Sequence, residues 1–142
     1  MGWAVTYTGV EGLTAVYSIS DEVGTTSALS GEQTAWKLSY AYGPITATAT
    51  GSDFDVQTAS ADQDVSSYAV SYTVSDELSV TYGAETIEEG TSEDVETFIL
   101  SASYTAGGMT ITGKMIEGEN VNHANTAGDD VDYWELGASF AF

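Results

Sequence analysis

The sequence has no cysteine, one proline, one histidine and only two basic residues among its 142 residues. The missing cysteines exclude disulfide scaffolds, zinc sites with thiolate ligands and cysteine nucleophiles. With a single histidine, His123, a metal site built from several histidines is excluded as well. The sequence has 22 acidic residues against these two basic ones. This balance excludes nucleic acid as a partner because phosphate binding requires basic side chains. No run approaches the roughly 18 apolar residues of a transmembrane helix.

The residues that are abundant favour strands. The chain contains 19 threonines and 16 serines, and 42% of its residues are hydrophobic and 11% aromatic. This apolar content argues against disorder. Threonine, serine, glycine, valine and tyrosine together outnumber the good helix formers, so we expect an all-β protein. The length predicts one domain that spans residues 1–142.

Apolar and polar residues alternate along the chain, which is typical of strands with two different faces. The last segment is the clearest case, because its apolar positions are Trp134, Leu136, Ala138, Phe140 and Phe142. Nine segments of this kind are predicted, at residues 2–9, 13–21, 34–43, 45–54, 66–75, 78–88, 95–106, 109–118 and 131–142. Short turns alternate with longer acidic connections between them, which predicts an antiparallel up-and-down meander.

Aromatic residues gather near both ends of the predicted strands, with small and aliphatic residues between them. On the side of the long connections they are Trp3, Tyr17, Trp36, Tyr68, Tyr82, Phe98 and Trp134. On the side of the short turns they are Tyr7, Tyr42, Tyr72, Tyr104, Phe140 and Phe142. Two aromatic belts that flank an aliphatic band are typical of a transmembrane β-barrel. The alternative interpretation is a soluble β-sandwich with aromatic strands.

The whole chain resembles the C-terminal portion of a general Gram-negative porin of the alphaproteobacterial type. The last strand carries the most specific part of the resemblance, with Trp134, Leu136, Phe140 and Phe142 matching the terminal assembly signal of outer-membrane barrels. The resemblance implies passive diffusion of ions and small hydrophilic solutes through a water-filled lumen. It also implies location in the outer membrane, contact with its lipid and lipopolysaccharide, recognition by the barrel assembly machinery, and a homotrimer.

The strand count leaves three interpretations open. In the topology of such barrels the last strand descends to the periplasm, so the first of nine strands also descends and begins outside. Single-chain bacterial barrels have an even number of strands, and nine strands therefore suggest part of a larger barrel. The alternatives are a chain that closes only by self-association, or a small eight-stranded barrel without a pore, if the count is one too high.

The charged residues are unevenly placed. All acidic residues except Glu11, Asp76, Glu77 and Glu135 fall in or beside the long connections, which makes 18 of the 22. This acidic rim would attract cations and bind divalent cations weakly, or it serves solubility alone. Lys37 and Lys114 are the only bases, and with Glu135 they fall on the Ser/Thr face of their strands. In a barrel that face lines the lumen, so these three residues are the candidate pore-lining charges.

Catalysis has little support in the sequence. His123 lies in a polar connection, and no serine nucleophile motif or phosphate-binding glycine loop is present. We therefore expect no enzyme, no catalytic residue, no metal site and no cofactor. The alternative function is a soluble or surface-exposed acidic β-protein that acts as an adhesin or a structural module.

Overall fold

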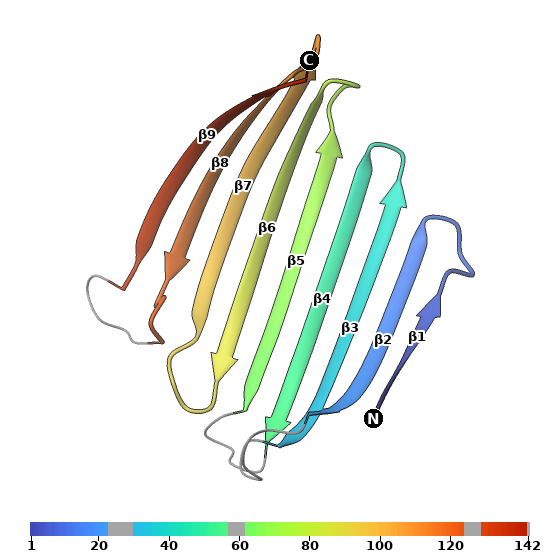
Figure 1. Ribbon diagram of the computed structural model, residues 1–142, viewed down its shortest axis with the longest axis vertical. Helices are drawn as coiled ribbons and strands as arrows, with labels where there is room; N and C mark the ends of the chain where they lie inside the picture. Colours follow the sequence, from blue (N-terminus) through green and yellow to red (C-terminus); the bar gives the residue numbers. More distant parts are fainter. Residues whose placement is uncertain (23–29, 57–61, 124–128, 142) are drawn as a thin grey trace.

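The computed structural model describes residues 1–22, 30–56, 62–123 and 129–141. These residues form a single antiparallel sheet whose strands follow one another in chain order (Figure 1). The described residues include no helix that is long and apolar enough to cross a membrane. The strands are β1 (Gly2–Tyr7), β2 (Leu13–Glu22), β3 (Gly31–Tyr42), β4 (Ile45–Val56), β5 (Gln63–Thr73), β6 (Leu78–Glu89), β7 (Val95–Ala106), β8 (Met109–Glu119) and β9 (Val131–Phe140).

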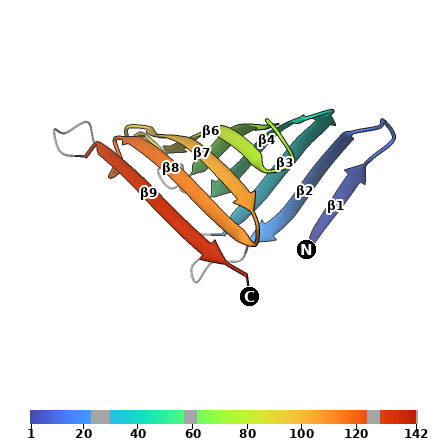
Figure 2. The ribbon, with the colours of Figure 1, turned by 90° about the horizontal axis from the view of Figure 1, so that it is seen from above.

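This architecture confirms the predicted all-β meander of nine strands and contradicts the eight-stranded alternative. Every strand pairs with the next one along the chain, from β1–β2 to β8–β9. The sheet bends into an open arch, with β1 at one edge and β9 at the other (Figure 2). Because all neighbours are antiparallel and the number of strands is odd, β1 and β9 run in the same direction.

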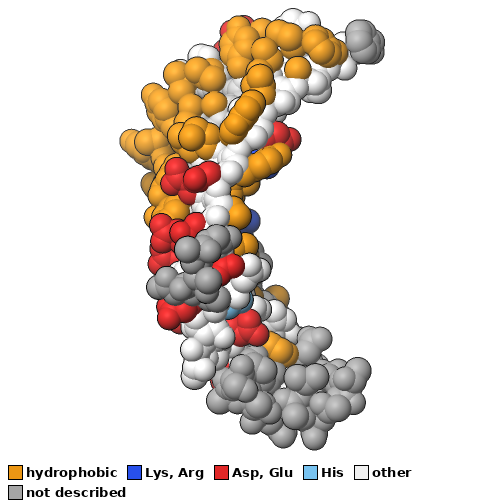
Figure 3. Space-filling model, turned by 90° about the vertical axis from the view of Figure 1, so that its left-hand side faces the viewer, with side chains coloured by type: hydrophobic (Ala, Val, Ile, Leu, Met, Phe, Trp, Pro, Cys, Tyr) orange, Lys and Arg blue, Asp and Glu red, His pale blue; other side chains and the backbone are white. Residues whose placement is uncertain are grey.

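The two faces of the sheet have the composition that the alternation predicts. The register places Trp36, Leu38, Tyr68 and Leu100 on one face, where each is between 45% and 50% exposed. Figure 3 shows hydrophobic side chains over the convex side toward the turn end, and acidic side chains toward the loop end. Among the described residues, the only buried hydrophobic side chain is that of Val95, at 7% exposed. The sheet therefore has no second layer within the described residues, and its apolar face is uncovered.

The concave face carries cross-strand pairs of hydroxyl groups. These pairs give the face hydrogen-bonding groups that carry no charge. The charged residues that the register also places on this face are Glu22, Lys37, Glu85, Glu89, Lys114 and Glu135. The oxygen–oxygen distances are 3.2 Å for Ser39–Thr48, 2.7 Å for Thr50–Ser67, 2.7 Å for Ser71–Thr81 and 2.9 Å for Thr105–Thr110.

Strand ends differ from the predicted ones mainly at the loop side. The prediction began the third strand at residue 34 and the fifth at 66, whereas β3 begins at Gly31 and β5 at Gln63. β4 likewise continues to Val56, two residues beyond its predicted end. Acidic residues have low strand propensity, so the sequence favoured loops here. The pairing continues because an outward-facing carboxylate stays solvated while its backbone completes the ladder.

Candidate functional site

The candidate site is an ion pair on the concave face near one edge of the sheet. Lys114 on β8 and Glu135 on β9 are register partners, and Lys114 Nζ lies 3.1 Å from Glu135 Oε2. Their side chains are 39% and 52% exposed, so both remain accessible to solute. The pair cancels its own charge in an otherwise hydroxyl-rich surface. The structure thus brings together two of the three candidate pore-lining residues.

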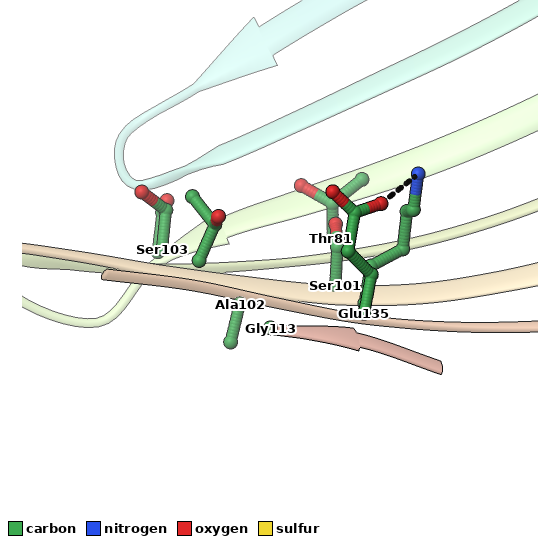
Figure 4. Close-up of a pocket in the computed structure, with 9 residues that line it drawn as sticks. Thr81, Ser101, Ala102, Ser103, Gly113 and Glu135 are labelled. Carbon is green, nitrogen blue, oxygen red and sulfur yellow. Dashed lines mark ion pairs between the residues drawn. The ribbon is translucent and has the colours of Figure 1, made fainter. Parts of the chain in front are cut away.

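Two rows of hydroxyl groups lie beside this ion pair on the concave face. In the first row, Thr81 on β6 and Ser101 on β7 are in register with Lys114 and then Glu135. The second row consists of Ser79 on β6, Ser103 on β7 and Thr112 on β8, which are register partners across these strands. Together the two rows and the ion pair line a depression of about 200 Å³. In Figure 4, Thr81, Ser101, Ser103 and Glu135 point to one side of the sheet, whereas Ala102 points away.

A glycine keeps one side of this depression open. Gly137 on β9 is the register partner of Thr112. A Cβ atom at Gly137 would lie 2.8 Å from Thr112 Oγ1, so a larger residue there would push into the hydroxyl row. We name the whole feature the hydroxyl shelf; it is lined by Ser79, Thr81, Ser101, Ser103, Thr112, Lys114 and Glu135.

An apolar row that the sequence analysis did not single out borders the hydroxyl shelf. Ile99 and Ile116 are register partners, and Tyr133 is the partner of Ile116. This row lies on the concave face, two residues along each strand from Ser101, Lys114 and Glu135. Tyr133 is 53% exposed. The alternation alone could have found it, because Tyr133 has the same parity as Glu135.

Lys37 lies on the same concave face but far along the sheet. It is on β3, where its register partners are Val16 and Thr50. Among the described residues, no carboxylate lies within ion-pair distance of its amine. The three candidate pore-lining residues therefore form a pair and a separate single charge rather than one cluster.

Acidic residues at the loop end of the strands face mainly outward. The register places ten of them on the convex face, level with the aromatic side chains or beyond them. We call these ten the outer acidic band, which comprises Asp21, Glu32, Asp53, Asp55, Asp64, Glu88, Glu96, Glu117, Glu119 and Asp132. Partial burial and the neighbouring Asp64 carboxyl raise the pKa of Asp53, which lies outside the aliphatic part of the sheet. Most of the acidic rim thus surrounds the outside of the arch rather than its hollow.

His123 joins two connections at the loop end. Its Nδ1 lies 3.1 Å from the backbone oxygen of Glu93, and its Nε2 lies 3.4 Å from Glu89 Oε2. Asn120 Nδ2 donates to the backbone oxygen of Asp94 at 3.2 Å. The turn after β8 is thereby held against the turn between β6 and β7. This arrangement gives His123 a structural role that sequence analysis missed, since the partners are about 30 residues away.

The described residues of the predicted terminal assembly signal face the convex side. Trp134, Leu136 and Phe140 are 73%, 71% and 59% exposed on β9. Phe142 lies outside the described residues. Within the part of the chain that the structure describes, no group of three or more potential metal ligands is placed to hold an ion.

The fold and the two faces define a class: this chain forms the curved wall of an antiparallel β-barrel, apolar outside and polar inside. Its structure is similar to two mutants of the Rh. blastica porin, with TM-scores of 0.74 and 0.70. Each is 22% identical, and the match covers 99% of this chain and 45% of the porin. Another porin structure matches with a TM-score of 0.72 and 21% identity, covering 96% of this chain and 50% of that one.

These matches show that the chain has the fold of part of a porin barrel. The chain spans about half the length of the porins it matches. No protein-family model matches the sequence, and no curated protein sequence matches it.

Proposed function

We propose that this chain is the C-terminal part of an outer-membrane porin, through which ions and small hydrophilic solutes diffuse passively. The uncovered apolar face of the sheet carries this proposal. Side chains such as Tyr42, Trp134 and Leu136 are between 71% and 73% exposed, with no protein layer over them in the described residues. A water-exposed face of this kind would be strongly unfavourable, whereas the hydrocarbon of a bilayer covers it at no such cost.

The free edges support a larger barrel. In lipid, the unpaired backbone groups of β1 and β9 would each cost several kcal/mol. Since β1 and β9 run in the same direction, they cannot close antiparallel on each other. Two copies in the same membrane orientation would meet the same obstacle, because β9 of one copy would run parallel to β1 of the other. An odd number of further strands closes the barrel with antiparallel pairs throughout, as in an even-stranded bacterial barrel.

The concave face supports a water-filled lumen. Lys37, Lys114 and Glu135 would line it and bias the passage of ions. Transport of this kind requires no bond to form or break, so we propose no enzymatic activity and no cofactor.

The surroundings of the chain follow from the same proposal. The outer membrane of a Gram-negative bacterium would be its location, with lipid and lipopolysaccharide against the convex face. The outer acidic band would meet the headgroup zone, where divalent cations could bridge it to lipopolysaccharide phosphates. Recognition of the β9 terminus by the barrel assembly machinery and assembly as a homotrimer complete the proposal, and crosslinking in cells would test both.

The deciding experiment is reconstitution of the protein, expressed from its own reading frame, into a planar bilayer. We expect discrete conductance steps whose size grows with KCl concentration, together with a requirement for detergent or lipid to keep the protein folded. A folded, monodisperse protein without detergent would instead support the soluble adhesin or structural module. Stable insertion without conductance would support a barrel that has no open pore.

A further inference from the structure

We infer that the hydroxyl shelf is a weak binding site for one ring of a neutral saccharide. The inference rests on the proposed pore, since it names the solute class that the lumen wall would favour. Its basis is the coincidence of three features in adjacent rows: five hydroxyl groups, one charge-neutral ion pair and one exposed aromatic ring.

The polar rows can satisfy the hydroxyl groups of a sugar. Each serine or threonine hydroxyl donates one hydrogen bond and accepts up to two. Lys114 uses one ammonium contact on Glu135, which leaves further donors on Lys114 and a second carboxylate oxygen on Glu135. Hydrogen bonds from a sugar hydroxyl to these charged groups are stronger than those between neutral partners. The shelf thus offers donors and acceptors in comparable numbers.

Charge selects against other small solutes. Lys114 opposes a simple cation at Glu135, and the formal net charge of −20 opposes an anion at Lys114. A neutral solute meets neither penalty. A zwitterion could bind only by replacing the 3.1 Å contact between the two side chains.

The apolar row supplies the complement to the ring's C–H face. Tyr133 is 53% exposed on the same side of β9 as Glu135, and Ile116 lies beside it in register. An aromatic ring buries apolar surface of a solute at low conformational cost because it has few rotatable bonds. The depression of about 200 Å³ is smaller than the roughly 300–1,000 Å³ of sites for drug-sized ligands. It therefore suits a single ring.

Ion-current noise in a planar bilayer tests this inference. D-glucose is added to the KCl solution, and triethylene glycol and glycine serve as comparison solutes. We expect glucose to produce brief blocks of the current whose occupancy saturates with concentration. Triethylene glycol should lower the current in simple proportion to its concentration, and glycine should not compete with glucose.

Variants locate the effect on the shelf. Tyr133→Ala and the double variant Lys114→Met, Glu135→Gln should each raise the half-saturating glucose concentration about fivefold or more. The current of each variant is normalised to its own conductance in KCl without glucose. Tyr133→Phe keeps the aromatic ring and should therefore keep the half-saturating glucose concentration close to that of the unmodified protein. Ser67→Ala is the matched control, because this hydroxyl lies on the same concave face but pairs with Thr50, away from the shelf. It should leave glucose saturation unchanged.

Two results would overturn the inference while the pore itself stands: no saturation with glucose, or equal loss in Ser67→Ala and Tyr133→Ala. Competition by glycine would assign the ion pair to zwitterions instead. If KCl produces no conductance at all, the proposed pore fails, and saturation-transfer NMR on the detergent-solubilised protein then decides glucose binding directly. Absence of transfer from the protein to glucose would reject the site.

Discussion

A charge placed on the convex face should reveal whether lipid covers it. Leu100 lies at the middle of β7, facing outward between Phe98 and Tyr104 of the two aromatic belts. It is 48% exposed. The adjacent Ser101 faces the concave side. Leu100→Arg and Ser101→Arg therefore place the same side chain at the same height on opposite faces.

The two variants should differ by a measurable free energy. An arginine that faces lipid at the bilayer midplane costs about 2–4 kcal/mol, whereas a surface substitution exposed to water usually changes stability by about 0.5 kcal/mol or less. We expect Leu100→Arg to destabilise by roughly 2–3 kcal/mol more than Ser101→Arg. Since about 1.4 kcal/mol is a tenfold change in an equilibrium constant, the unfolding equilibrium constants of the two variants should differ by about 30-fold or more.

The measurement is reversible unfolding by guanidinium in lipid vesicles, followed by tryptophan fluorescence. Leu100→Ala serves as a control that removes apolar contact without adding charge. Equal free energies of unfolding for Leu100→Arg and Ser101→Arg would refute the lipid-facing assignment. A large loss in Ser101→Arg alone would mean that the concave face, and not the convex one, is the apolar environment.

Three further changes probe the lumen, the loop end and the turns. Lys114→Met leaves the opposite carboxylate unpaired, so the cation-to-anion permeability ratio from reversal potentials in a KCl gradient should rise about twofold or more; a fall would contradict the lumen assignment. His123→Ala removes both ring contacts to the neighbouring turn, at a cost of about 1 kcal/mol, and hydrogen exchange should quicken at the amides of 120–123 but not in β4. Gly12→Ala should cost more than the ~1–2 kcal/mol of a left-handed conformation, because its Cβ would meet the backbone oxygen of Ala41. Gly43→Ala has open space at φ 56° and should cost only that conformational term, so equal melting shifts would contradict the steric account.

Much of the fold could be predicted from local pattern. Period-two alternation is a property of each strand alone, so residues 131–142 already indicated that Trp134 and Leu136 share a face. Turn positions were equally local: Gly12, Gly43 and Gly108 have the positive φ angles that tight turns require. The strand count followed from these two signals.

Register lay beyond the sequence because it depends on how separate strands align. The parity of Lys114 and Glu135 placed both on one face, yet only the β8–β9 ladder sets them opposite each other at 3.1 Å. The alternation already put Ile99, Ile116 and Tyr133 on this face, and the same ladders set the three residues side by side.

The sequence by itself determined an all-β meander with one aromatic-belted face, one hydroxyl-rich face and two basic residues on the latter. Its alternation and its turn residues are sufficient for this, since both act within a few residues of one another. Only the tertiary structure decided that the apolar face is uncovered and convex and that most strand-end carboxylates point outward. It alone also placed His123 between two turns. These features arise from strand pairing and sheet curvature, which join residues far apart in the chain.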